Sequence, residues 1–144
     1  MKILVTGGSG YKGTVLVDNL LNNGHKVTSV DTQWFGNYLN NHKNLTNIKL
    51  DIRNTNQIPV KGHDVIVHLA NIANDPAVEL NPSLSWEINV LAGQQLIEKA
   101  KKENVSQFIY ASSGSVYGVK DELKVTEDLE LVPISIYNLS LIHI

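Results

Sequence analysis

Three glycines spaced three residues apart, Gly7, Gly10 and Gly13, follow directly on the short apolar run that starts the chain. Glycines in this arrangement permit a tight turn and let backbone N–H groups approach an anion closely. A helix predicted from residue 11 onward would place the positive end of its dipole at the same point. The pattern therefore favours a pyrophosphate ligand, contacted also by Tyr11 and Lys12, over a glycine-rich loop that binds nothing. The Lys12 ammonium opposes the helix dipole, so we expect it to turn to the pyrophosphate or to solvent.

An acidic residue, Asp31, ends the second apolar run, 18 residues after Gly13. A carboxylate at this point of a dinucleotide-binding unit accepts hydrogen bonds from the ribose hydroxyls of the adenosine half and repels a 2′-phosphate. The sequence has no arginine between Asp31 and Lys43 that could bind such a phosphate. The pattern predicts NAD rather than NADP, although an aspartate in a surface turn would explain this residue taken alone.

These residues need a scaffold that brings the ends of separate segments together. Apolar runs typical of buried strands lie at residues 2–5, 26–30, 47–50, 64–69 and 107–111, and helical patterns lie at residues 11–23 and about 81–104. Strands alternating with helices predict an α/β fold, a Rossmann-type doubly wound parallel sheet with its ligand site at the carboxyl ends of the strands. Residues 32–46 are predicted as loop with at most one short helix, and residues 74–76 as a loop facing the site.

Helical spacing also predicts which side chains the helices bury. The long helix is expected to begin with Asn81 as N-cap and Pro82 as its first residue. The predicted inner positions are Val15, Leu16, Leu20 and Leu21 in the first helix, and Leu84, Ile88, Leu91, Leu96, Ile97 and Ala100 in the second.

The stretch from Thr6 to Gly13 resembles the fingerprint of the extended short-chain dehydrogenases/reductases, and further motifs narrow the resemblance to NAD-dependent nucleotide-sugar epimerases and dehydratases. The resemblance implies a strand order of 3-2-1-4-5, with a sixth strand missing here. It also implies cofactor contacts at several later positions. These are Asp51 and Ile52 at the adenine, the backbone of Leu69, Ala70 and Asn71 along the cofactor, and Asn89 as a brace of the dinucleotide site.

The resemblance also implies two catalytic residues, Ser113 and Tyr137. Ser113 is the hydroxyl residue three positions before Val116 in the motif that ends Val-Tyr-Gly, and Tyr137 follows it by 24 residues. The family's lysine, four residues after the tyrosine, would lower the tyrosine pKa from its usual value near 10. Leu141 stands at that position. Without the lysine, Tyr137 is expected to be a poor general base.

The last six residues, 139–144, can be encoded by codons that are similar to the transposase end sequence used in preparing DNA libraries. We therefore expect residues 1–138 to be an incomplete NAD-binding Rossmann domain, residues 139–144 to be a non-native tail, and the substrate-binding domain to be absent. The alternative is a genuine C-terminus that happens to have this sequence.

The sequence as a whole indicates an enzyme portion that binds NAD and, in the complete protein, a nucleoside-diphosphate sugar, with a homodimer implied by the resemblance. Two alternatives stay open: a non-catalytic dinucleotide-binding or redox-sensing module, and an NAD(P)-dependent sugar or aldehyde reductase. The net charge of -2 gives no basic field for nucleic acid, no apolar run suits a membrane, and a cytoplasmic protein is expected. The chain has no cysteine, and its five histidines show no metal-binding spacing. His68 is predicted to be a buried structural residue.

Overall fold

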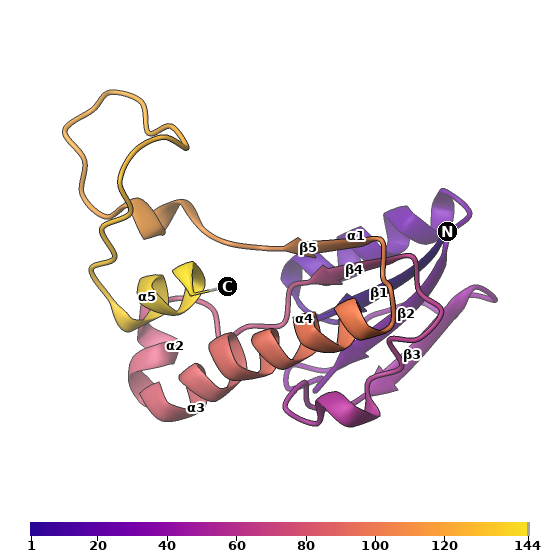
Figure 1. Cartoon of the computed structure of the whole chain (residues 1–144). Helices are drawn as coiled ribbons and strands as arrows, with labels where there is room; N and C mark the ends of the chain where they lie inside the picture. Colours follow the sequence, from indigo (N-terminus) through magenta and orange to yellow (C-terminus); the bar gives the residue numbers. More distant parts are fainter. Residues whose placement is uncertain (144) are drawn as a thin grey trace.

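The computed structural model describes residues 1–143, and its centre is a five-stranded sheet in the order β3-β2-β1-β4-β5 (Figure 1). All of the neighbouring strands are parallel. Both the α/β class and the strand order were predicted from the sequence, and both are confirmed. In chain order the elements are β1 (Lys2–Thr6), α1 (Tyr11–Asn22), β2 (Lys26–Asp31), β3 (Leu45–Lys49), η1 (Thr55–Gln57), β4 (Val65–His68), α2 (Asp75–Leu80), α3 (Pro82–Trp86), η2 (Glu87–Ala92), α4 (Gly93–Lys102), β5 (Gln107–Tyr110), η3 (Gly114–Tyr117) and α5 (Ile136–Ile142).

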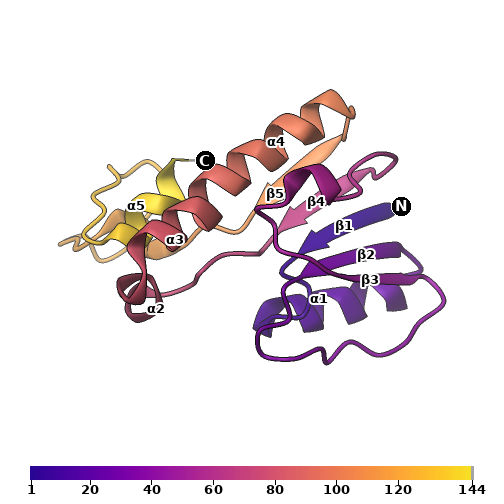
Figure 2. The same cartoon turned by 90° about the horizontal axis from the view of Figure 1, so that it is seen from below.

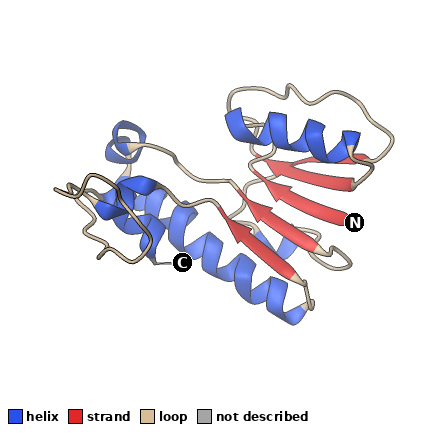
Figure 3. Cartoon of the chain, turned by 90° about the horizontal axis from the view of Figure 1, so that it is seen from above, coloured by secondary structure: helices blue, strands red, loops and turns tan. Residues whose placement is uncertain are grey.

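Helices cover the two faces of the sheet, with α1 on one face and α4 on the other (Figure 3). Successive residues of β1 point to opposite faces, so Leu4 joins the core under α4 and Val5 the core under α1. Val17 of α1 and Leu96 of α4 are the buried side chains that meet them on each side. The short helices α2, α3 and α5 contact one another and gather beyond the carboxyl ends of the strands (Figure 2).

The predicted inner face of α1 was wrong at one position. Val15 is 62% exposed, and the fully buried residue of this helix is Val17. Leu16 and Leu20 pack at the margin of the core, and Leu21 is buried. The buried stripe of α1 thus runs through Gly13, Val17 and Leu21, at intervals of four residues.

The long helix is continuous in space but changes its winding. Asn81 caps it as predicted, since its side chain accepts a hydrogen bond from the Leu84 N–H, and Pro82 is the first helical residue. Residues 87–92 then form a π-helical segment. Leu91, which the spacing placed on the inner side, is 46% exposed, and a buried stripe of this helix runs through Ile88, Ala92, Leu96 and Ala100, at intervals of four.

Smaller differences concern element ends and short helices. β3 begins and ends earlier than the predicted strand at residues 47–50, and β1 continues to Thr6. The segment from residue 32 to 44 forms no helix, whereas the predicted loop at residues 74–76 contains the start of α2, capped by the Asn74 side chain. β5 lies at one end of the sheet, with half of its residues exposed. Within residues 1–143, no helix has the length and apolar character that crossing a membrane would require.

Candidate dinucleotide-binding site

The glycine loop joins β1 to α1 at the carboxyl end of the central strand. Gly7 takes a positive φ of 76°, and a Cβ there would lie 2.7 Å from the backbone nitrogen of Ala70. A Cβ on Gly13 would collide with the carbonyl oxygen of Gly7. Side chains at these two positions would therefore push apart the loop, the first turn of α1 and the segment after β4. Because both residues are glycines, the loop, the first turn of α1 and the segment after β4 meet through backbone atoms alone, and we call this arrangement the backbone cradle.

The start of α1 has no side-chain cap among the described residues. Gly10 is its N-cap and supplies no capping hydrogen bond, and the turn contains no acidic residue. Backbone N–H groups at such a helix start are left without partners inside the helix, and they suit an anion together with the helix dipole. Tyr11 and Lys12, which begin this helix, are exposed.

Asp31 ends β2 directly above the glycine loop. Its carboxylate accepts a hydrogen bond of 3.0 Å from the Ser9 N–H and one of 2.6 Å from the Gln33 N–H. These bonds hold the carboxylate between the glycine loop and the turn after β2. A carboxylate has about four acceptor positions, so Asp31 retains capacity for hydroxyl donors.

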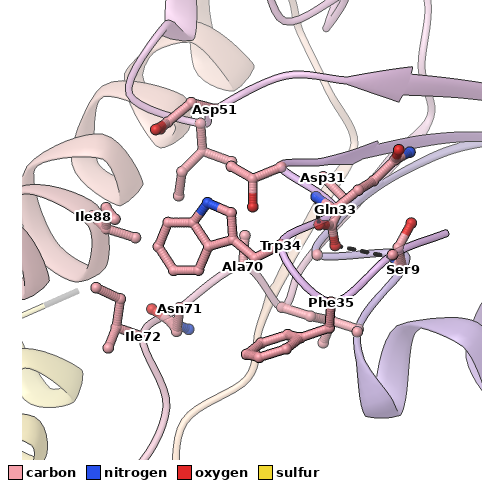
Figure 4. A pocket seen from close by; sticks show the side chains of 16 residues that line it. Ser9, Asp31, Gln33, Trp34, Phe35, Asp51, Ala70, Asn71, Ile72 and Ile88 are labelled. Carbon is pink, nitrogen blue, oxygen red and sulfur yellow. Dashed lines mark hydrogen bonds between the residues drawn. The ribbon is translucent and has the colours of Figure 1, made fainter. Parts of the chain in front are cut away.

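A cavity of about 150 Å³ opens between these elements (Figure 4). It brings together eight of the predicted cofactor residues: Gly7, Gly10, Asp31, Asp51, Ile52, Leu69, Ala70 and Asn71. Tyr11, Lys12, Gly13 and Asn89, predicted in the same set, do not line it, and neither do Ser113 and Tyr137. The remaining lining residues, which are not in the predicted cofactor set, are Ser9, Thr32, Gln33, Trp34, Phe35, Gly36, Ile72 and Ile88.

Asp51 lies at the edge of this cavity and is paired with Arg53. The Arg53 guanidinium contacts Asp51 at 2.8 Å and Glu87, at the start of η2, at 3.1 Å. The hydrogen bonds and charge of Arg53 hold the pKa of Asp51 below its usual value. Each oxygen of the Asp51 carboxylate already accepts two contacts from Arg53, so a further donor must share an oxygen with the guanidinium.

Asn89 is fully buried in η2 and acts on the cavity through the backbone of Ile72. Its Oδ1 accepts from the Ile72 N–H at 2.8 Å, and its Nδ2 donates to the Ile72 carbonyl at 3.1 Å. The same amide donates to the Ser140 hydroxyl at 3.2 Å. One side chain therefore fixes the segment after β4 along the wall of the cavity.

His68 ends β4 and is fully buried, as the sequence predicted. Its Nδ1 is hydrogen bonded to the Thr6 hydroxyl at 2.6 Å, and its ring stacks on Tyr110 with centroids 5.6 Å apart. Its Nε2 has no hydrogen-bond partner in the part of the chain that the structure describes. Burial lowers the pKa of His68 to about 4, so the ring is neutral at pH 7. Within residues 1–143, no three histidine or acidic side chains are grouped as metal ligands would be.

Ser113 and Tyr137 lie on the neighbouring elements η3 and α5, which contact each other. Ser113 is the N-cap of η3: its hydroxyl oxygen accepts from the Ser115 N–H at 3.2 Å and lies 2.8 Å from the Ser115 hydroxyl. Burial raises the pKa of Tyr137, and the nearby Asp75 carboxylate raises it further, against a hydrogen bond with the Asn74 backbone. Leu141, one turn after Tyr137 on α5, is buried at 4% exposure.

The fold and the site define a Rossmann-type domain with a dinucleotide-binding cradle. Residues 3–144 match the family described as NAD dependent epimerase/dehydratase. The chain belongs to this family, whose members include NAD-dependent sugar epimerases and dehydratases.

Individual relatives agree with this assignment. The chain is 34% identical over 142 residues to a putative UDP-glucose 4-epimerase of Methanocaldococcus jannaschii, covering 96% of this chain and 47% of the relative. The structure of a UDP-N-acetylglucosamine 4-epimerase from Methanobrevibacter ruminantium, in complex with UDP-N-acetylmuramic acid, superposes with a TM-score of 0.89 and 32% identity over 98% of this chain and 47% of that one. A dTDP-glucose 4,6-dehydratase from Streptomyces venezuelae with bound NAD gives a TM-score of 0.91 and 27% identity over 99% and 49%. The chain thus spans about half the length of these relatives.

Proposed function

We propose that this chain binds NAD in the cavity at the carboxyl ends of β1, β2 and β4. The observation that carries the proposal is the bare backbone cradle, where a Cβ on Gly7 would lie 2.7 Å from the Ala70 nitrogen. The close approach of these three segments leaves no side chain in the way of a pyrophosphate that binds the backbone N–H groups at the start of α1. The bound NAD of the related dehydratase supports the same ligand.

Each part of the cavity suits one part of the dinucleotide. The N–H groups at the first turn of α1 would bind the pyrophosphate, and the exposed Lys12 ammonium would add a positive charge. Asp31, already oriented by Ser9 and Gln33, would accept hydrogen bonds from the ribose hydroxyls. The same carboxylate would repel the 2′-phosphate of NADP. Asn89 would act indirectly by fixing Ile72.

For the complete protein we propose epimerisation or dehydration of a nucleoside-diphosphate sugar, in a homodimer. NAD would accept a hydride from the sugar and return it. Tyr137 would take the proton of the sugar hydroxyl, and Ser113 would hydrogen bond the reacting oxygen. The names of the relatives support the substrate class, since both structures are of enzymes for nucleotide sugars.

The 144-residue chain itself is proposed to lack turnover. Burial and Asp75 raise the pKa of Tyr137, which is the opposite of what a general base needs at pH 7. The buried Leu141 occupies the position of the family's lysine. Residues 139–144 are proposed to be foreign to the natural protein, and the nucleotide sequence after the codon of Asn138 tests this directly: a frame that continues with lysine at position 141 supports it, and the same leucine in genomic DNA contradicts it.

A second candidate, a dinucleotide-binding module without catalysis, is favoured by the same buried Leu141. It shares the NAD site and differs only in the absence of chemistry. Genomic DNA that encodes leucine at position 141 would favour this candidate over the enzyme.

Calorimetric titration of the chain with NAD and NADP tests the binding proposal. NAD should bind at least about tenfold more tightly than NADP, a difference of about 1.4 kcal/mol. Asp31→Ala should weaken NAD and reduce the discrimination, while Asp18→Ala, a change of an acidic residue outside the cavity, should alter neither. Equal or tighter binding of NADP would contradict the proposed role of Asp31.

A further inference from the structure

A tight turn after β2 presents two aromatic side chains at the mouth of the cavity. The Gly36 N–H donates to the Gln33 carbonyl, which places Trp34 and Phe35 at the tip of the turn. Gln33 has a positive φ of 57°, a conformation that few residues other than glycine adopt. Two hydrogen bonds hold the turn in place. The Gln33 N–H donates to the Asp31 carboxylate, and the Gln33 side-chain amide donates to the Asn47 side chain of β3 at 3.3 Å. An anchored, strained turn of this kind points to a required position for the side chains it carries.

The Trp34 indole is one of the side chains that line the cavity. It is drawn between Asp31 on one side and Ile72 and Ile88 on the other (Figure 4). With Ile52, which also lines the cavity, these isoleucines give it an aliphatic wall. Trp34 nevertheless keeps 59% of its surface exposed. A large aromatic group that is left open above an apolar wall is suited to cover a flat, apolar ligand.

We propose that Trp34 clamps the base of the bound dinucleotide. The indole stacks on one face of the adenine, and the aliphatic wall of Ile52, Ile72 and Ile88 receives the other. The proposal rests on NAD binding as the proposed function, and it assigns a binding contribution to a residue outside the glycine loop and the strand-end acids. The Asp31 carboxylate, which would bind the ribose, also accepts the hydrogen bond from the Gln33 N–H. The clamp and the ribose site therefore share one residue.

Stacking predicts a particular pattern among fragments of the ligand. Trp34 lines the cavity next to Asp31, the proposed site of the adenosine ribose, so the stacking contribution follows the adenine and not the nicotinamide. ADP should therefore depend on Trp34 as strongly as NAD does, and nicotinamide mononucleotide should not depend on it. Phenylalanine should replace tryptophan in part, because it keeps a flat ring.

The test is titration calorimetry of the 144-residue chain and three variants with NAD, ADP and nicotinamide mononucleotide. Trp34→Ala should weaken NAD and ADP by about tenfold, and Trp34→Phe by less. Tyr38→Ala is the matched control, since Tyr38 is a 72% exposed aromatic residue of the same loop that does not line the cavity. Thermal unfolding of each variant checks that the fold is retained. Trp34 and Trp86 are the only tryptophans, so the emission of Trp86→Phe reports on Trp34 alone and should change when ADP binds.

The outcomes separate the two proposals. If the unsubstituted chain binds NAD and Trp34→Ala binds it equally well, the clamp is wrong and the NAD site stands. The clamp is equally wrong if Trp34→Ala and Tyr38→Ala weaken ADP to the same extent, or if Trp34 emission does not respond to bound ADP. If the unsubstituted chain binds no NAD, the proposed function fails and the clamp fails with it.

Discussion

Replacing His68 should remove a specific part of the pH dependence of stability. The folded domain keeps the imidazole fully buried, with Nε2 lacking a partner among residues 1–143, and its pKa is lowered to about 4. In the unfolded chain the same ring has its ordinary pKa of about 6.5. Between these two values the unfolded chain binds a proton that the folded domain does not. The free energy of unfolding must therefore fall as the pH falls through this window.

The size of the effect follows from the two pKa values. The interval from 6.5 to about 4, at about 1.4 kcal/mol for each pH unit, corresponds to about 3–4 kcal/mol. This loss in the free energy of unfolding is absent above pH 6.5, grows as the pH decreases, and is complete near pH 4. It is a large part of the roughly 5–15 kcal/mol that stabilises an ordinary domain.

Urea denaturation followed by circular dichroism between pH 7 and pH 4 measures this effect. His68→Leu should be less stable at pH 7, because the Thr6 hydroxyl loses its partner, but its stability should fall less steeply toward pH 4. His42→Gln, a change of an exposed histidine, should keep the original slope. Carboxylates titrate in the same range, so the informative quantity is the difference between variants. Parallel pH profiles for His68→Leu and the unsubstituted chain would refute the reasoning.

Two further predictions concern the backbone around the cavity. Gly13→Ala places a Cβ against the Gly7 carbonyl and 2.7 Å from Gly8. The NAD affinity measured by calorimetry should therefore fall by more than about tenfold, and the melting temperature should drop. The control is Gly114→Ala, whose Cβ would meet nothing within 4 Å and should change neither the NAD affinity nor the melting temperature. Asn89→Leu leaves the N–H and the carbonyl of Ile72 without their partners, so urea denaturation should show a loss of about 2–4 kcal/mol, and equal stability of the variant would contradict the bracing role.

The sequence predicted most of the fold because the central strands β1 and β4 are short, apolar and largely buried. Such runs identify a parallel sheet, and glycine spacing identifies the loop that follows the first strand. The burial of Leu91 was predicted wrongly because the smaller Ala92, and not Leu91, continues the buried stripe of Ile88, Leu96 and Ala100. The larger apolar residue of a neighbouring pair was taken as the buried one, and the structure buries the smaller.

The candidate site was predictable where backbone geometry demands a residue type. Gly7 and Gly13 belong to this class, and so does Asp31 through its position at a strand end. Trp34 was not singled out, because its proposed role depends on a turn held by a local bond from Gln33 to Asp31 and by a second bond from Gln33 to Asn47 of β3. A pair of adjacent aromatic residues three and four positions after Asp31, in an Asn-rich loop, was the available signal.

The measurement that tests the central claim most directly is an ¹H–¹⁵N correlation spectrum of the labelled chain during titration with NAD. Binding at the proposed site predicts saturable shifts of the amides of Gly7, Ser9, Gly10, Ile52 and Ala70, which surround one cavity. Amides at the opposite ends of the strands, such as those of Lys26 and Gly62, should not move, and NADP at the same concentration should produce smaller shifts. Shifts that are absent, or that gather away from the glycine loop, would contradict the account of this chain as an NAD-binding domain.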